Sequence, residues 1–481
     1  MDFYVVTYVI GWVLQFEAVF LVIPVLVGLG CHEREHALIY LGVALLCLIT
    51  GTCFKLAKKK KGELYVREGF ASVALAWIFL SVFGALPFVL TGEIPSFTNA
   101  LFETISGFTT TGASILPEVE SFSRISLFWR SFTHWLGGMG VFMLILAVLP
   151  MLGDHSINLM RAESAGPSVE KLFPKVRDTA MLTYALYVLL TVIGTIALVI
   201  SGLNLFDSST LMFGTVGTGG FSVYDDSVVS LTSSQQWIIA VFMTLGAVNY
   251  TAYYYLLLRR FRAILNFEEI WVYFGMIAAS TLLIAGNVHG LYPTMGETVR
   301  HSFFMVTSIM STSGFATTDF NGWPAFSKSI MLILMLVGGC AGSTAGGFKV
   351  ARLTILIKAI RKEFRSLIHP EEHKKLYVNR EPLSSETLRS VNSFAALYFV
   401  TLGISVLLIS IGNDFDFMTL FSSASTCMNC VGVAFEKVGY GCNFDIYSGF
   451  AKYVLMLDMI AGRLEFFPLL ALFFPSCWRK Y

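Results

Sequence analysis

The sequence predicts an all-α integral membrane protein, and three observations support that prediction. The 481 residues are 55% hydrophobic and only 14% charged, whereas about a quarter of the residues in a soluble domain are charged. A helix needs roughly 20 apolar residues to cross the hydrocarbon of a bilayer, and several runs approach or exceed that length. Basic residues recur between the runs. The runs are residues 4–30, 37–54, 69–91, 178–202, 236–258, 270–288 and 392–412.

Charge divides the loops into two classes. By the positive-inside rule the basic loops face the cytoplasm, which places both termini inside.

The net charge of +1 argues against nucleic-acid binding. No basic residue precedes the first apolar run, so it lacks the positive start of a signal peptide and we expect it to remain as a helix. The basic stretches are 55–67, 161–177, 259–262, 349–389 and 479–480, and the segments expected outside are 31–36, 92–128, 204–235, 290–328 and 413–450.

One unit recurs four times along the chain. Each copy contains an apolar span, a shorter half-apolar stretch, a turn of small residues around a glycine, and a second span with its own glycine. A small residue also stands six positions before each turn glycine. We call the four turns, with the glycine third in each, the filter turns. They are Thr110, Thr111, Gly112 and Ala113; Thr218, Gly219, Gly220 and Phe221; Thr312, Ser313, Gly314 and Phe315; and Cys430, Val431, Gly432 and Val433.

The repeat predicts a pore. The stretches before the turns are too short to span a bilayer, so each re-enters from outside, and non-helical backbone at that depth must line water or be buried in protein. Backbone carbonyls at such turns can replace the hydration shell of a monovalent cation, and glycine adopts the required angles without a Cβ clash. The alternative is a set of Gly/Thr turns between ordinary spans. We favour one central pore because the four copies are in register.

The repeat also predicts the organisation of the chain. Four units with two spans each, preceded by two further spans, give about ten transmembrane helices. We expect an N-terminal pair of helices at 1–66 and four helix–pore-loop–helix units at 67–176, 177–266, 267–390 and 391–481.

Five segments resemble the TrkH-type potassium transporters of the Trk/Ktr/HKT superfamily. They are TISGFTTTGAS (104–114), TGGFS (218–222), MSTSGFATTDF (310–320), GGCAGSTAGGFKVAR (338–352) and AGRLEFFPLL (461–470). The resemblance covers essentially the whole chain, and the first helix pair is more similar to TrkH than to KtrB. It implies potassium uptake across the plasma (inner) membrane of a prokaryote, without enzymatic chemistry.

The resemblance further implies how the pore is selective and regulated. In the superfamily, glycine at the first filter turn accompanies potassium preference and serine accompanies sodium, and Gly112 fits the first case. The fourth turn departs from the family, which tends toward two asparagines where this chain has Asn429 and Cys430 before Val431. The family implies a homodimer with one pore in each chain and a cytoplasmic nucleotide-binding ring of TrkA type. NAD/NADH or ATP/ADP would act only through that ring, with K⁺ as the transported ion and no cofactor in this chain.

Two features after the filter turns are candidates for a gate. Ten successive small residues, 338–347, interrupt the third unit's second span; a close helix contact is the alternative, whereas the family implies a mobile intramembrane gate. Arg463 lies in an apolar span, where a charge usually faces a cavity or a partner. In the family it projects into the pore, and pairing with an acid on another helix, for example near Asp458, is the alternative. The candidate gate residues are Gly338, Gly339, Gly342, Ser343, Thr344, Gly346, Gly347, Lys349 and Arg463.

Three motifs suggest other functions. Residues 32–36 read HEREH and match the H-E-x-x-H zinc signature of a metalloprotease, but they form a short polar link without an evident third ligand. Cys427 and Cys430 form a lone C-x-x-C, a spacing that redox and metal sites use. GSTAGGFK at 342–349 lacks the lysine position and strand context of a phosphate-binding loop. We expect no transition-metal site and no nucleotide binding by this chain.

Passive or partner-gated K⁺ uptake is the leading hypothesis. A sodium-permeable or proton-coupled cation symporter of the same fold is the alternative, an intramembrane zinc metalloprotease is a remote one, and a receptor or scaffold would pass no ions. The basic surface at 349–389 is where we would dock a regulatory partner, although positive-inside bias also explains it. Its residues include Lys358, Arg361, Lys362, Arg365, Lys374 and Lys375.

Overall fold

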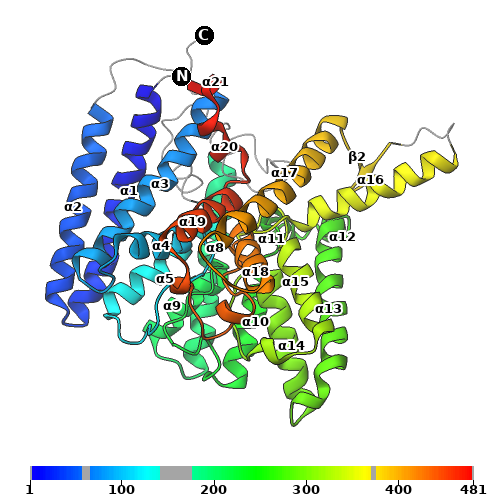
Figure 1. The fold of residues 1–481 in the computed structure, drawn as a ribbon, viewed down its shortest axis with the longest axis horizontal. Coiled ribbons are helices and arrows are strands. Elements are labelled where there is room, and N and C mark those ends of the chain that lie inside the picture. The colour runs from blue at the N-terminus through cyan, green and yellow to red at the C-terminus, as the bar shows by residue number, and fades with distance from the viewer. Residues whose placement is uncertain (1–2, 57–64, 141–175, 370–374, 479–481) are drawn as a thin grey trace.

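The structure of the protein is a computed structural model and describes residues 3–56, 65–140, 176–369 and 375–478. Within these ranges, six helices are long and apolar enough to cross a membrane by length and composition. Each of the four repeated units also contains a shorter helix after its filter turn (Figure 1). The six are α1 (Phe3–Gly30), α2 (Arg34–Leu56), α3 (Val66–Leu90), α8 (Val176–Ile200), α13 (Glu268–Val288) and α17 (Ser385–Ser410).

The outer surface of these helices is apolar, as expected of a protein that faces lipid. Leu26 of α1 is 63% exposed, Leu282 of α13 is 74% exposed and Leu407 of α17 is 70% exposed. Monomeric soluble proteins rarely expose large contiguous apolar patches. The predicted all-α multi-pass membrane fold is confirmed.

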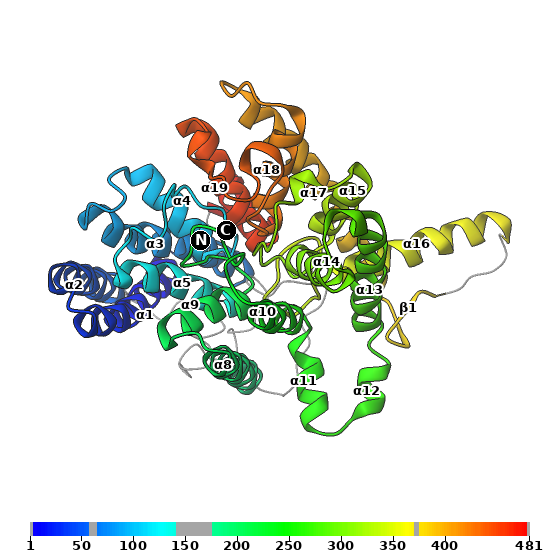
Figure 2. The same ribbon diagram turned by 90° about the horizontal axis from the view of Figure 1, so that it is seen from below.

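Four units surround a common centre, and α1 and α2 lie outside the first of them (Figure 2). Each unit is a long helix, a half-helix, a filter turn and a second helix. The first unit is α3, α4 (Phe97–Phe108) and α5 (Arg124–Met139); the second is α8, α9 (Leu205–Val216) and α10 (Ser233–Gly246); the third is α13, α14 (Met295–Met310) and α15 (Ala325–Val337); and the fourth is α17, α18 (Phe417–Asn429) and α19 (Gly449–Arg463).

Shorter elements connect the units. A two-stranded antiparallel hairpin, β1 (Tyr377–Val378) and β2 (Glu381–Pro382), precedes α17. Its two turn residues, Asn379 and Arg380, have positive φ, as a two-residue type I′ hairpin turn requires. The remaining elements are α11 (Tyr250–Leu257), α12 (Phe261–Leu265), η2 (His289–Leu291), η3 (Phe320–Gly322), α16 (Val350–Ile368), η4 (Glu436–Val438), η5 (Phe444–Ile446), α20 (Phe467–Phe473) and α21 (Pro475–Trp478).

Three of the four half-helices begin at polar caps. Asn204, Thr294 and Asp416 stand before α9, α14 and α18, and each side chain accepts a hydrogen bond from a backbone N–H of the first turn. Such caps satisfy the orphan donors of a helix start. The half-helices contain 12 to 16 residues, which is fewer than the roughly 20 that a bilayer requires. Each therefore enters only part of the membrane, as the sequence predicts.

The second helices differ from the sequence prediction. The run 236–258 reads as one apolar span, but α10 ends at Gly246 and α11 begins at Tyr250. At the break, Ala247 O accepts a hydrogen bond from Cys340 N of the third unit at 3.1 Å, and the Asn249 side chain caps α11 by accepting from Thr251 N at 2.8 Å. The fourth unit is interrupted too, since Glu465 and Phe466 have positive φ between α19 and α20. The expected break in the third unit spans 338–349, between α15 and α16.

The link between α1 and α2 has a structural role. Glu33, the glutamate of the HEREH motif, accepts hydrogen bonds from Arg124 N at 2.9 Å and Ile125 N at 3.0 Å. The Glu33 carboxylate thus caps the start of α5. In the part of the chain that the structure describes, no group of three or more His, Cys, Asp or Glu residues is placed to hold a metal ion.

The first helix, α1, begins at the same end of the molecule at which the last helix, α21, ends (Figure 1). Some of the basic residues used in the orientation argument lie outside the described residues. These are Lys58, Lys59, Lys60, Lys61, residues 161–175, Lys374 and residues 479–480.

Candidate functional site

The filter turns share one backbone conformation. The first residue of each turn is in the left-handed region, and so is the glycine two positions later. Positive φ is a genuine outlier for a β-branched residue, and such strain persists only where the surrounding structure enforces it, commonly at functional sites. The φ values are 56° for Thr110, 54° for Thr218, 58° for Thr312 and 53° for Cys430, and 79°, 81°, 79° and 91° for Gly112, Gly220, Gly314 and Gly432.

A hydrogen bond that recurs in all four units fixes each turn to its half-helix. The residue before the glycine donates its N–H to the carbonyl of the small residue six positions before the glycine. The pairs are Thr111 N to Ser106 O at 2.9 Å, Gly219 N to Gly214 O at 2.8 Å, Ser313 N to Ser308 O at 2.9 Å and Val431 N to Thr426 O at 3.0 Å.

The small side chains at those positions lie directly beneath the turns. Ser308 Oγ donates to Phe315 O at 2.6 Å, and Thr426 Oγ1 donates to Val433 O at 2.8 Å. In the second unit a Cβ added to Gly214 would lie 3.1 Å from the corresponding carbonyl, that of Phe221. In the third and fourth units these side chains therefore support the turn by a hydrogen bond, and in the second unit the space beside the turn is tight.

The four turns close into a ring. A Cβ added to Gly112 would overlap Gly219 O of the second unit. The same clash relates Gly220 to Ser313 O of the third unit, Gly314 to Val431 O of the fourth, and Gly432 to Thr111 O of the first. Each glycine therefore packs against the carbonyl that precedes the next glycine around the axis. No other residue type fits there without moving a neighbouring backbone.

The fourth turn keeps this geometry although its sequence departs from the others. Cys430 takes the left-handed position of the threonines, and Val431 makes the shared hydrogen bond to Thr426 O. The Asn429 side chain is directed away to α17, where it accepts from the Tyr398 hydroxyl at 3.0 Å. The fourth turn therefore has the same backbone shape as the other three, although Cys430 and Val431 replace the residues found there.

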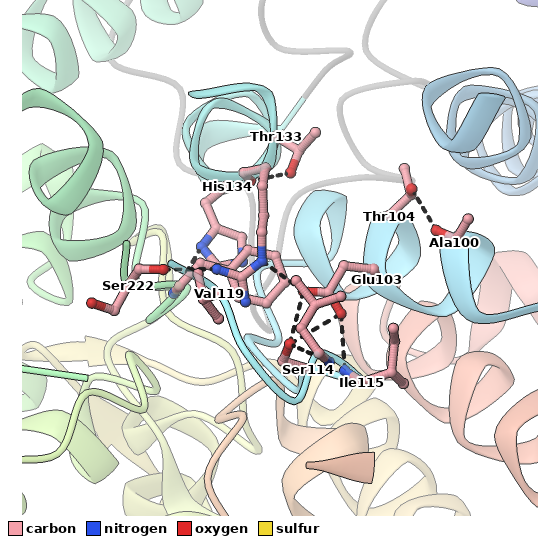
Figure 3. A network of polar contacts seen from close by, with 12 residues as sticks. Ala100, Glu103, Thr104, Ser114, Ile115, Val119, Thr133, His134 and Ser222 are labelled. Atoms are coloured by element: carbon pink, nitrogen blue, oxygen red, sulfur yellow. Dashed lines mark hydrogen bonds and ion pairs between the residues drawn. The ribbon is translucent and has the colours of Figure 1, made fainter. Parts of the chain in front are cut away.

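A buried ion pair holds the first two turns together, and the sequence analysis did not identify it. Glu103 of α4 pairs with Arg130 of α5 at 2.6 Å, and both side chains are at most 3% exposed. The Glu103 carboxylate accepts from Ser114 Oγ at 3.0 Å and Ile115 N at 3.0 Å, directly after the first turn (Figure 3). Arg130 also donates to Ser222 O, after the second turn, at 2.9 Å.

Aromatic contacts reinforce that arrangement. The Arg130 guanidinium lies 3.5 Å from the centre of the Phe221 ring, and His134 stacks on the same ring at 4.0 Å. Phe221 is the fourth residue of the second turn. The sequence does contain a signal for the Glu103–Arg130 pair. The two residues are opposite charges in apolar stretches of one unit, and charged residues in such stretches are functional candidates in membrane proteins.

The 338–349 segment lies against the inner ends of the half-helices. Thr344 Oγ1 lies 3.0 Å from Val216 O, at the end of α9, and 3.0 Å from Gly246 O, at the end of α10. Gly346 N donates to Thr312 Oγ1 of the third filter turn at 2.7 Å. A Cβ at Gly346 would overlap Asn429 O at the end of α18. The segment thus contacts three of the four units.

Arg463 connects that segment to the first unit. Its guanidinium donates to Thr344 O at 2.9 Å and to Gly138 O of α5 at 2.5 Å, and it also contacts Gly137 O. Carbonyl oxygens of two units therefore accept hydrogen bonds from Arg463, whereas Glu465 pairs with Arg352 of α16. Buried Lys349 donates to Ala345 O within the segment.

The remaining candidates lie in three places in the described part of the chain. Cys427 and Cys430 are free, buried thiols, and Cys430 Sγ lies 3.8 Å from Met459 O. On the basic surface, Lys358 forms an ion pair with Glu268. The candidate gate residues Gly338, Gly339, Gly342, Ser343 and Gly347 all lie in the 338–349 segment, and Gly338, Gly342 and Gly347 have positive φ.

Comparison with known proteins agrees with this architecture. A sequence model of the TrkH family, described as a cation transport protein, matches residues 36–275 and 261–480. The Trk system potassium uptake protein TrkH of Escherichia coli (strain K12) is 36% identical over 432 residues, 88% of each chain. TrkG of the same strain is 32% identical over 483 residues, 99% of each chain.

A solved structure shares the whole fold. The crystal structure of the potassium transporter TrkH from Vibrio parahaemolyticus superposes with a TM-score of 0.85 and 29% sequence identity, covering 100% of both chains. The chain therefore belongs to the TrkH family of cation transport proteins.

Proposed function

We propose that this chain conducts K⁺ through a pore formed by the four filter turns. The observation that carries the proposal is the closed ring of glycine-to-carbonyl packing between successive units, which brings four strained turns around one axis. Carbonyl oxygens arranged in rings replace the hydration shell of a permeating ion. Gly112, Gly220 and Gly314 are half-buried while the residues before them are buried, as suits backbone at the edge of an open path.

The half-helices favour a cation on that axis. Each runs from its N-terminal end toward its filter turn, so its C-terminal end, with partial negative charge, points at the centre of the molecule. Four such ends converge, and the Glu103–Arg130 pair adds no net charge beside them. The proposed pore therefore attracts a monovalent cation without a carboxylate ring, and glycine at all four turns supports K⁺ over Na⁺ in this family.

The 338–349 segment and Arg463 form the proposed gate. The segment is non-helical and contacts the end of half-helix α9 and the third filter turn. Arg463 of the fourth unit donates to the segment and also to α5 of the first unit, so it joins the segment to both units. A positive side chain below the turns also opposes a cation electrostatically. Opening of the pore then requires the segment to leave these partners.

The larger assembly belongs to the same proposal. We infer a homodimer in the inner membrane, with both termini cytoplasmic and the four units divided at 67–176, 177–266, 267–390 and 391–481. A nucleotide-binding ring of TrkA type, responding to NAD/NADH or ATP/ADP, would act on the cytoplasmic surface that includes α16. The basic residues at 349–389 and the name of the Trk system in the relatives support this inference.

Rubidium uptake into proteoliposomes tests the proposal. Purified chain in vesicles loaded with K⁺ should accumulate radioactive Rb⁺, more so with the regulatory ring and its nucleotide, and excess external K⁺ should compete. Uptake that requires a pH or Na⁺ gradient would establish a coupled symporter instead. No uptake under any of these conditions would reject ion conduction.

A further inference from the structure

Glu269, which the sequence analysis did not single out, lies at both ends of the 338–349 segment. It stands in the first turn of α13 and is 8% exposed. One carboxylate oxygen, Oε1, accepts a hydrogen bond from Ala341 N at 2.6 Å and another from Ala351 N at 3.0 Å. Ala341 is near the start of the segment, and Ala351 is in the first turn of α16, just beyond its end.

We propose that Glu269 is a positioning residue that latches the 338–349 segment in its closed arrangement. The proposal rests on the proposed gating role of that segment. A single carboxylate joins the two ends of the segment, so the loop between them is closed against α13 as well as against the filter turns. Hydrogen bonds to a charged acceptor are worth roughly twice those between neutral groups, and a negative charge at the first turn of α16 is favoured by the helix dipole.

Neighbouring contacts give the latch a connection to the exposed hairpin. Glu268 N donates to Asn379 Oδ1 in the hairpin turn at 3.0 Å, and the Glu268 carboxylate pairs with Lys358 of α16. Lys358 also donates to Tyr377 O of β1 at 2.8 Å. The start of α13, the start of the hairpin and α16 are therefore one bonded cluster, and Glu269 is the member of that cluster that reaches the segment.

The consequence is that removing the carboxylate should favour the open state. Glu269→Ala leaves two backbone N–H groups without their acceptor, whereas Glu269→Gln keeps an oxygen acceptor in place and loses only the charge. We expect basal Rb⁺ uptake without the regulatory ring to rise roughly tenfold or more in Glu269→Ala and by a smaller factor in Glu269→Gln.

The matched control is Glu386→Gln. Glu386 occupies the first turn of α17, the corresponding long helix of the next unit, and is exposed. It should leave basal uptake unchanged. Equal basal uptake in wild type, Glu269→Ala and Glu269→Gln would overturn the control of conduction by the latch, provided that wild-type protein transports Rb⁺; failure of wild type to transport would overturn the proposed function itself.

A second measurement follows the segment directly. Cys340 is a fully buried free thiol next to Ala341, so its modification by a water-soluble thiol reagent, located by peptide mass spectrometry, reports release of the segment. Labelling of Cys340 should be at least about fivefold faster in Glu269→Gln than in wild type or Glu386→Gln. Unchanged labelling would refute the latch. Faster labelling with unchanged uptake would keep the latch and show that the segment is not the gate.

Discussion

A strained residue recurs at the start of each filter turn. Three threonines and a cysteine adopt positive φ at equivalent positions of the four units. The cost of about 1–3 kcal/mol for each such residue is tolerated because every turn is hydrogen-bonded to its own half-helix and packed on the next unit. At the scale of single residues, the filter is a set of conformations that its neighbours impose.

The Glu103–Arg130 pair makes a prediction about stability. Arg130→Met would leave the Glu103 carboxylate buried without its charge partner, and breaking a buried pair in this way costs about 3–5 kcal/mol. The unfolding midpoint of the purified protein in detergent should fall clearly, and the double variant Glu103→Gln with Arg130→Met should recover part of the loss.

Lys328→Met is the control for that experiment. Lys328 pairs with Glu436 at 3.5 Å, with 25% and 42% of the two side chains exposed, and exposed pairs contribute about 0–1 kcal/mol. If Arg130→Met unfolded at the same temperature as Lys328→Met, the buried pair would not be holding the first two turns.

At the scale of elements, the interrupted second helices have unequal roles. The break in the third unit supplies the 338–349 segment, and the break after α10 exists where that segment takes Ala247 O as a hydrogen-bond acceptor. The break after α19 follows Arg463, which reaches the segment from the fourth unit. The interruptions are thus parts of one contact region below the filter turns.

Thr344 offers a test of that contact region. Thr344→Val keeps the shape of the side chain but removes the hydroxyl that contacts Val216 O and Gly246 O. Losing about 1 kcal/mol of hydrogen bonding in the closed state should raise basal Rb⁺ uptake about fivefold.

The comparison variant is Thr354→Val in α16. The Thr354 hydroxyl donates to Val350 O of its own helix at 2.9 Å, so this substitution removes a hydroxyl without separating the segment from another unit. Basal uptake that rises equally in both variants, or in neither, would argue against Thr344 as part of the closed contact.

The sequence predicts the elements better than their interruptions. Apolar length identifies α1, α3 and α17 directly, and the small residues at 338–347 identify the break in the third unit. The break after Gly246 is harder to see, because residues 236–258 are mostly apolar and only Gly246 and Asn249, the cap of α11, mark it locally. The hydrogen bond from Cys340 N to Ala247 O that accompanies the break comes from far along the chain.

The same reason explains what was missed in the site. The filter turns could be aligned because each carries its own glycine, whereas Glu103 and Arg130 each occur in only one unit and have no repeat to mark them. Arg463 was noticed because it stands in an apolar span, but its carbonyl partners on α5 and in the 338–349 segment depend on how the four units meet.

At the scale of the whole molecule, one chain supplies a complete ring. Unit one packs on two, two on three, three on four, and four on one through the same glycine-to-carbonyl contact. A membrane potential contributes about 2.3 kcal/mol per charge per 100 mV, so a selective and gated path is sufficient for uptake of K⁺ down its electrochemical gradient. Under the proposed function, selectivity depends on the spacing between neighbouring turns.

The reversal potential of reconstituted protein in opposed K⁺ and Na⁺ gradients tests this account most directly, with Gly112→Ser and Gly92→Ser beside the wild type. Both glycines have positive φ, 79° and 77°, but a Cβ at Gly112 overlaps Gly219 O whereas one at Gly92 has no neighbour within 4 Å. The account predicts that the wild type and Gly92→Ser reverse near the K⁺ equilibrium potential and that Gly112→Ser shifts toward Na⁺. A wild type that follows the Na⁺ gradient, or a Gly112→Ser variant with unaltered selectivity, would contradict it.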